Sequence, residues 1–439
     1  MEESTFRIPL YLPAQGATET EATLIEWHVV EGDFFEKGQV LAQVDSVKSV
    51  FDFQAPCSGR VMRLLHLEGE TIPYTEPVLE IETADQGMRD WIPPAVTVSP
   101  IEPRQQPLPD RKTGKGDLPT AAILGVGGYL PDRVVSNEDL VRWFPDVSPD
   151  YVYQVTGIRQ RRWATDGEKP SDMAYAASLE AIRKANIAIK DIDAVIVATT
   201  TPDVAMPSMA CILQDRLGLG SIPAFDLNAA CSGWLYAVAM AQNMILTSMA
   251  RNVLTIGVDM QSRLLDKNDR NTCFIFGDGA GAAVISAASS GHQIRRVILG
   301  SDARGLRMAR REEPGYLVSN GYAEVDPWIR LDGQILFRYA TESFIHLIRD
   351  MLDYAGWAAD DTRWVIPHQA NGRILKAAAK RSGVPFDRFF LNVERVGNTS
   401  SASIPLAMIE AEEGLRSGDK LVLCSVGAGL TTAAVAVEW

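Results

Sequence analysis

The sequence has 439 residues, of which 46% are hydrophobic and 22% charged, and its net charge is −14. This length allows two or three domains with at least one large core, and the negative charge argues against nucleic acid as the main ligand. No stretch reaches the roughly 20 apolar residues of a membrane span, and the acidic start MEESTFRIPL lacks a signal-peptide pattern. The five cysteines, at positions 57, 211, 231, 273 and 424, show no CxxC spacing. They predict reduced thiols in a cytoplasmic protein without a metal site.

Residues 1–83 predict a small all-β domain. Segments such as VLAQVDSV, SVFDFQAP and PVLEIE are short, rich in strand-forming residues, and separated by turn sequences such as EKG and CSG. Short strands at this spacing are typical of a β-sandwich.

Residues 84–118 predict a flexible linker. Prolines recur in WIPPAVTVSPIEPRQQPLPD, and the segment shows no apolar period. This composition is typical of a tether between two folded domains.

Residues 119–439 predict an α/β domain, because buried strands such as DAVIVATTTP alternate with helical segments such as AMPSMACILQDRLGL. The order strand, turn, helix occurs in AFDLNAACSGWLYAVAMAQNMI and again in FFLNVERVGNTSSASIPLAMIEA. We therefore expect an internal duplication, with halves at about 119–290 and 291–439 and functional residues at the strand-to-helix turns.

Three polar residues stand at such turns. Cys231 lies where AFDLN gives way to a helix, and a helix N-terminus favours a thiolate. His368 follows a buried strand, and Asn398 precedes a helix. Taken singly, each has an ordinary structural interpretation: a small buried cysteine, a satisfied histidine, a helix cap. Together they indicate a nucleophile with two polarising partners.

The motifs NAACSGW, FGDGAGAAV, PHQANGRI, GNTSSASIP and GAGLTTAAV, in this order, resemble the β-ketoacyl-acyl carrier protein synthase III family of the thiolase fold. The resemblance covers about residues 120–439. It implies a homodimer with a duplicated, layered α-β-α-β-α fold. It also implies that Cys231 takes an acyl group as a thioester, that His368 and Asn398 assist decarboxylation of a malonyl thioester, and that the amides of Cys231 and Ala428 form an oxyanion hole. The product would be a 3-oxoacyl thioester on the phosphopantetheine of an acyl carrier protein, with release of CO2.

At the expected entrance of the site the sequence departs from the family. Tyr151 and Val155 stand where members that use acyl-CoA carry a tryptophan and an arginine, whereas Arg270 and Asn371 match the family's carrier-binding positions. Loss of a phosphate-binding cation weakens the case for acyl-CoA as the donor.

Two further positions take their roles from the resemblance. Met206 falls where the family walls the acyl pocket, and because methionine is flexible it does not reveal the chain length. Arg373 matches a position at which the family docks the acyl carrier protein.

The segment EGDFFEKGQVLAQVDSVKSVFDFQAPCSG resembles the lipoyl and biotinyl carrier domains, with Lys48, Pro56 and Gly59 at the family's positions. Biotin carriers have Met on both sides of the lysine, but here the neighbours are Val47 and Ser49. The resemblance therefore implies a lipoyl group on Lys48, added by a lipoate-attaching enzyme. A 2-oxo acid dehydrogenase system would load this arm with the acyl group for Cys231.

Three alternatives stay open at this point. The chain could be an acyl-CoA-primed synthase whose β domain only docks partners. It could be a non-condensing acyltransferase that acts on an amine or a hydroxyl group. It could also be a binding protein on an inactive thiolase fold, although the Cys–His–Asn set argues against that interpretation.

Overall fold

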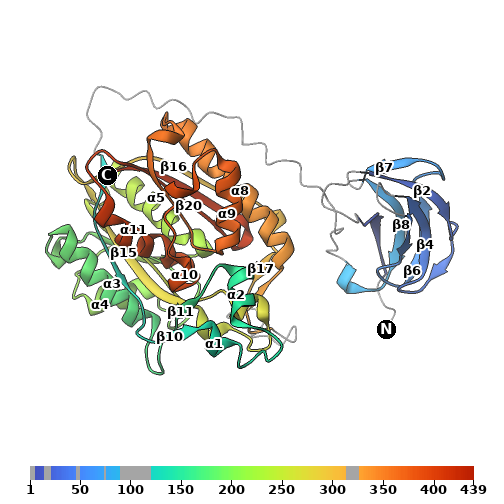
Figure 1. Cartoon of the computed structure of the whole chain (residues 1–439), viewed down its shortest axis with the longest axis horizontal. Helices are drawn as coiled ribbons and strands as arrows, with labels where there is room; N and C mark the ends of the chain where they lie inside the picture. Colours follow the sequence, from blue (N-terminus) through green and yellow to red (C-terminus); the bar gives the residue numbers. More distant parts are fainter. Residues whose placement is uncertain (1–4, 14–20, 46–49, 74–75, 89–119, 313–325) are drawn as a thin grey trace. The chain divides into compact units, whose positions relative to one another are not determined.

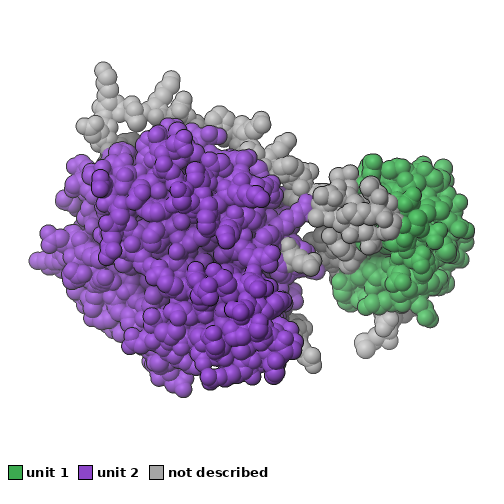
Figure 2. Space-filling view, in the orientation of Figure 1, with its two compact units in different colours: residues 1–112 green, residues 113–439 purple. Residues whose placement is uncertain are grey.

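The computed structural model describes all residues except 1–4, 14–20, 46–49, 74–75, 89–119 and 313–325. The chain forms two compact units, residues 1–112 and 113–439 (Figure 2). The predicted boundaries at 83 and 118 flank a segment that lies mostly outside the described residues, so they stay predictions.

The first unit is a sandwich of two four-stranded sheets, with strand orders β1-β8-β6-β3 and β5-β4-β2-β7 (Figure 1). Alternate residues of the strands face one shared core, as Leu79, Ile81 and Thr83 do in β8. The strands are β1 Phe6–Tyr11, β2 Glu21–Trp27, β3 Phe34–Phe35, β4 Val40–Asp45, β5 Val50–Gln54, β6 Gly59–Leu64, β7 Thr71–Pro73 and β8 Pro77–Thr83.

Strands β4 and β5 form the hairpin of the predicted modified lysine. Asp45 pairs with Val50, so residues 46–49 connect two paired strands, but Lys48 itself lies outside the described residues. Gly59 begins β6, where a Cβ would lie 2.6 Å from the Glu82 carbonyl oxygen. The glycine of the carrier-domain motif is therefore required by the close packing of two strands.

The second unit is built on nine strands in the order β13-β12-β14-β15-β9-β16-β21-β20-β19. The strands are β9 Ala121–Tyr129, β12 Ala194–Ala198, β13 Ala224–Leu227, β14 Asn252–Met260, β15 Asp278–Ala287, β16 His292–Ser301, β19 Thr362–Pro367, β20 Lys420–Gly427 and β21 Thr431–Glu438. Short pairs are formed by β10 Val134–Ser136 with β11 Gln160–Arg162 and by β17 Ala309–Arg310 with β18 Arg330–Leu331.

The pairing pattern shows the duplication. In the first half, β13, β12 and β14 pair in parallel, and β15 and β9 follow antiparallel. In the second half, a parallel bridge joins Phe389 to β19, β19 pairs in parallel with β20, and β21 and β16 follow antiparallel. The two halves thus repeat one strand order, as expected for the predicted duplicated fold.

The helices form three layers around these strands (Figure 1). Helices α5 and α11 share a core with residues such as Ile196 and Leu423, whereas α3 and α4 pack on Val195 and Val197, and α8 and α9 pack on Val422. Neighbouring residues of one strand face opposite layers, since strand side chains alternate. The helices of these layers are α3 Pro170–Ala185, α4 Met209–Arg216, α5 Gly233–Leu246, α8 Gly333–Ala355, α9 Gly372–Ser382 and α11 Ser403–Ala411. The other helices are α1 Asn137–Leu140, α2 Pro149–Thr156, α6 Arg270–Cys273 and α10 Val393–Val396.

Candidate active site

The three polar residues singled out from the sequence lie in one cavity. Cys231, His368 and Asn398 all line a pocket of about 780 Å³ in the second unit. They come from segments that are far apart in the chain and from both halves of the duplicated fold. The pocket is therefore made by the way the two halves meet.

Cys231 lies in a turn between β13 and α5. This turn is the 3₁₀ segment Ala230–Ser232, and Ala230 before the cysteine has a positive φ of 47°. Strands of the second half hold the turn, since Ser425 Oγ donates a hydrogen bond of 2.9 Å to the Cys231 carbonyl and Thr431 Oγ1 donates one of 2.8 Å to the Ala229 carbonyl. A strained backbone that is fixed from outside is typical of a functional residue.

Burial raises the pKa of the Cys231 thiol to about 12. This effect opposes the stabilisation of a thiolate that is expected from the helix N-terminus. The thiol is protonated near neutral pH, so its proton must leave as it reacts.

His368 follows β19 and is only 1% exposed. Its Nδ1 shares a hydrogen bond of 2.6 Å with Ser403 Oγ, which leaves Nε2 available to the cavity. Burial lowers the pKa of His368 to about 3, so the ring is neutral at working pH. A neutral ring donates from Nε2 only if Nδ1 accepts, which requires that Ser403 donates.

Asn398 lies in the loop before α11. Its Oδ1 accepts a hydrogen bond of 2.8 Å from the Ser400 N–H, and its Nδ2 donates one of 3.3 Å to the Ala370 carbonyl. Gly397, with a φ of 72°, makes the turn that precedes it. The amide is thus oriented by the backbone, and one Nδ2 hydrogen is left for a ligand.

The loop that carries Ala428 faces the nucleophile. A Cβ on Gly427 would lie 2.9 Å from the Cys231 backbone nitrogen, so only glycine allows the two segments to approach this closely. Cys231 and Ala428 both line the cavity. The two residues whose amides are predicted to form the oxyanion hole therefore line one cavity.

Family models match three segments of the chain. Residues 225–303 match 3-oxoacyl-[acyl-carrier-protein (ACP)] synthase III, residues 352–439 match the C-terminal model of the same enzyme, and residues 9–81 match a family described as biotin-requiring enzyme. The β-ketoacyl-[acyl-carrier-protein] synthase III of Caldanaerobacter subterraneus is 40% identical over 324 residues, which cover 73% of this chain and 98% of that protein. The chain belongs to the β-ketoacyl-acyl carrier protein synthase III family.

Solved structures of synthase III enzymes have the same fold. The enzyme of Aquifex aeolicus VF5 is 37% identical, with a TM-score of 0.67. The match covers 73% of this chain and 100% of the Aquifex chain. The priming β-ketosynthase of the R1128 polyketide pathway is 33% identical with a TM-score of 0.68 and covers 73% of this chain and 96% of that one. The predicted fold class and acyltransferase class are confirmed, and so is the resemblance of the N-terminal domain to lipoyl and biotinyl carriers.

The pocket also contains positions at which the family resemblance implies carrier binding. Tyr151, Val155, Arg270 and Asn371 all line the cavity, and Tyr151 is 48% exposed. Asn371 caps α9 through its side chain and donates a hydrogen bond of 3.5 Å to the Val155 carbonyl. These four predicted positions therefore lie together.

Arg270 is engaged by an acid that the sequence did not single out. Its guanidinium donates hydrogen bonds of 2.5 and 2.6 Å to the two carboxylate oxygens of Asp146, and this contact lowers the pKa of that carboxyl group. The cation matched to the family's carrier-binding position is thus partly neutralised within this chain.

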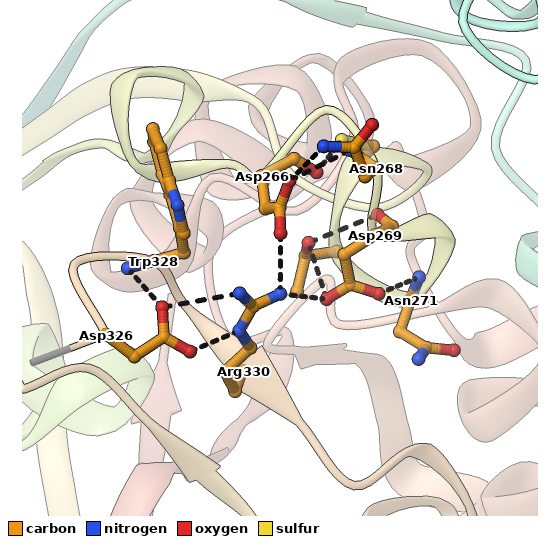
Figure 3. Close-up of polar contacts among 9 residues, drawn as sticks. Asp266, Asn268, Asp269, Asn271, Asp326, Trp328 and Arg330 are labelled. Atoms are coloured by element: carbon orange, nitrogen blue, oxygen red, sulfur yellow. Dashed lines mark hydrogen bonds and ion pairs between the residues drawn. The ribbon is translucent and has the colours of Figure 1, made fainter. Parts of the chain in front are cut away.

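A second arginine fixes the segment that carries Arg270 (Figure 3). Arg330, in β18, donates to Asp326 at 2.5 Å and to Asp266 at 2.9 Å, and its Nη1 lies 3.6 Å from Asp269. Asp269 is the N-cap of α6, the helix that starts with Arg270. Ile329 and Leu331, on either side of Arg330, line the cavity, as Arg270 does. The ion cluster therefore holds together two segments of the cavity lining.

Met206 and Arg373 are not among the residues that line the cavity. Met206 is 86% exposed in the loop after β12, so its role in walling the acyl pocket stays a prediction. Arg373 is exposed in the first turn of α9, where a surface partner can reach it.

The sequence analysis missed the hydroxyl groups around the site. Ser400 contacts Cys231 and Asn398, and Ser403 contacts His368. Between these two serines, Ser401 donates hydrogen bonds to Asp259 from its Oγ at 2.7 Å and from its N–H at 3.1 Å. The signal was the run TSSAS beside Asn398, since several small hydroxyl residues at one buried turn need partners.

The described residues contain no cluster of His, Cys, Asp or Glu that could hold a metal ion. In the same part of the chain, no helix combines the length and the apolar composition needed to cross a bilayer.

Proposed function

We propose that this protein condenses an acyl group with a malonyl thioester on an acyl carrier protein and releases CO2. The observation that carries the proposal is that Cys231, His368 and Asn398 line one cavity, which Ala428 lines as well. Family membership supports it, because the relatives are β-ketoacyl-[acyl-carrier-protein] synthases III.

The first half-reaction loads Cys231. The sulfur attacks the carbonyl carbon of an acyl thioester, the carbon–sulfur bond of the donor breaks, and the thiol proton of Cys231 is transferred to the departing thiolate. The carbonyl oxygen gains negative charge in this step, and the backbone amides of Cys231 and Ala428 would stabilise it. Acyl-Cys231 and a free thiol are the products.

The second half-reaction forms the carbon–carbon bond. Loss of CO2 from the malonyl thioester places negative charge on the thioester oxygen, which His368 Nε2–H and Asn398 Nδ2–H stabilise as donors. The resulting carbanion attacks the carbonyl carbon of acyl-Cys231, and the sulfur leaves. A neutral His368 suits this role when its single ring proton is on Nε2, which faces the cavity while Nδ1 accepts from Ser403.

Measurement of CO2 against product tests this reaction. With malonyl-acyl carrier protein and an acyl donor, we expect one CO2 for each 3-oxoacyl product, and no turnover without the malonyl group. A non-condensing acyltransferase would instead give an amide or an ester and no CO2, and that result would contradict the proposal.

We further propose that the acyl group reaches Cys231 from Lys48. The family match at residues 9–81 supports a covalently attached group, and the pairing of Asp45 with Val50 fits a lysine in a short hairpin connection. A lipoyl group there would supply a thiol that presents the acyl group as a thioester. Residues 84–118 would tether the domain and make delivery intramolecular. A lipoate-attaching enzyme and a 2-oxo acid dehydrogenase system are the implied partners.

Direct priming by acyl-CoA is the second candidate, since Tyr151, Arg270 and Asn371 remain at the entrance. If Asp146 neutralises Arg270, replacing Asp146 with asparagine should lower the KM for acyl-CoA by about two- to fivefold, because Asp146 would no longer compete with the phosphates for the guanidinium. The KM for a short thioester without phosphates should not change.

Asp150→Asn is the matched control, because Asp150 is an acid of the same region, in the first turn of α2. Equal effects of the two substitutions on the KM for acyl-CoA would mean that only the overall charge matters. No effect of Asp146→Asn would show that the ion pair does not limit the use of acyl-CoA.

Arg373, exposed on α9, is the proposed contact for the acyl carrier protein. The homodimer and the cytoplasmic location stay predictions.

A further inference from the structure

A hydroxyl group contacts the sulfur of Cys231. Ser400 Oγ lies 3.6 Å from Cys231 Sγ in the geometry of a hydrogen-bond donor, and both residues line the cavity. Ser400 is only 2% exposed. Its side chain therefore reaches a reacting atom from a position that is held by packing.

The backbone of Ser400 is fixed in an uncommon conformation. Its φ is 52°, in the left-handed region that residues other than glycine seldom adopt. The Ser400 N–H donates to Asn398 Oδ1 at 2.8 Å, and the next residue, Ser401, donates from both N–H and Oγ to Asp259. Such a conformation persists only where several surrounding contacts hold it. Residues in such conformations cluster at functional sites.

The duplicated fold gives Ser400 a defined place. Ser400 begins the 3₁₀ segment Ser400–Ala402 before α11, as Ala230 begins the segment before α5, and Ala230 also has a positive φ. In the second half, the residue equivalent to Ala230 therefore carries a hydroxyl group, which points at the nucleophile of the first half.

The sulfur needs such a donor, because burial disfavours its anion. Among the described residues, Ser400 supplies the side-chain hydrogen bond that reaches it. His368 is neutral, and Asp259 adds negative charge behind the segment that contains Ser400. The other charged or titratable side chains that line the cavity are those of Tyr151, Arg270, Arg310 and Arg311.

We propose that Ser400 is a further catalytic residue, whose hydroxyl donates a hydrogen bond to the Cys231 sulfur and stabilises the thiolate. The thiolate forms when Cys231 loses its proton to attack the acyl donor, and again when the condensed product leaves. Asp259 acts as a positioning residue, since it holds Ser401 and with it the backbone of Ser400. The role in turnover rests on the proposed function, but the contact can be tested on the thiol alone.

The test is the rate at which iodoacetamide alkylates Cys231 in the full chain, followed by the mass of the Cys231 peptide between pH 7 and 9. Ser400→Ala and Ser400→Gly both remove the hydroxyl, and glycine also accepts the positive φ, so it tests the contact without new strain. Loss of a donor to an anion raises the thiol pKa by about one unit or more. A more basic thiolate is also more nucleophilic, so the rate at fixed pH should fall about threefold per unit.

Ser178→Ala is the matched control. Ser178 is also fully buried, but its hydroxyl donates to the Ala174 carbonyl within α3. Slower alkylation in both Ser400 variants, with the wild-type rate in Ser178→Ala, supports the proposal. A wild-type rate in Ser400→Gly overturns it, and so does an equal loss in Ser178→Ala. If the Ser400 variants were alkylated more slowly but neither they nor the wild-type protein catalysed condensation, the contact between Ser400 and Cys231 would be supported and the proposed function rejected.

Discussion

Replacement of Cys231 by alanine should abolish condensation, with a loss on the order of 10⁴-fold or more in kcat, because no other group at the turn can hold the acyl chain. Release of CO2 from malonyl-acyl carrier protein should continue within about tenfold of the wild-type rate. The donors that stabilise the decarboxylated thioester come from His368 and Asn398, and alanine leaves the backbone of the turn in place. The two rates are measured separately, as 3-oxoacyl product and as CO2.

Cys211→Ala is the control for this experiment, since Cys211 is exposed on α4 and does not line the cavity. It should keep both rates. If Cys231→Ala lost the release of CO2 as completely as condensation, His368 and Asn398 would not act independently of the nucleophile. If Cys231→Ala kept condensation, the acyl group would not pass through Cys231 at all.

Replacement of Lys48 by arginine should remove the covalent modification and with it the delivery of the acyl group from the N-terminal domain. A guanidinium keeps the charge of the lysine, but it cannot form the amide that attaches a lipoyl group. We expect at least a hundredfold loss of turnover when the acyl group is supplied through lipoyl loading, since a tether raises the effective concentration by 10²–10⁴-fold. Turnover with a short soluble thioester should stay within about twofold.

The mass of the Lys48 peptide provides a readout that does not depend on activity. Wild-type chain produced with a lipoate ligase should carry the lipoyl mass, and Lys48→Arg should not. Lys37→Arg is the matched control, because Lys37 is an exposed lysine of the same domain and lies outside the hairpin. An unmodified Lys48 in the wild-type chain would reject the arm and favour priming by acyl-CoA.

Part of the site could be predicted because its residues stand at recognisable junctions. Cys231, His368 and Asn398 each follow a strand or precede a helix within a motif, so their order along the chain carried the resemblance. Their hydroxyl partners carried a weaker signal. The contact between Ser400 and Cys231 joins residues 169 positions apart, and no local pattern specifies it.

Arg270 and Met206 show the same difference between what a motif predicts and what the fold sets. Arg270 could be matched from its motif, but its ion pair with Asp146 spans 124 positions and arises only when α6 and the loop before α2 come together. Met206 was matched by motif as well, yet only the folded chain shows that its side chain is 86% exposed. A motif identifies a residue type at a position, whereas its neighbours are set by the folded chain.

The sequence by itself determined the β domain, the duplicated α/β domain and the chemistry-bearing residues, because strand alternation, helix period and turn residues are local properties of the chain. Only the tertiary structure decided the protonation states. Burial raises the pKa of the Cys231 thiol and lowers the pKa of His368, because the loss of hydration opposes charge in each case, so both groups are favoured in their neutral states. Burial is produced by residues from both halves of the fold, so neither state could be deduced from the local sequence.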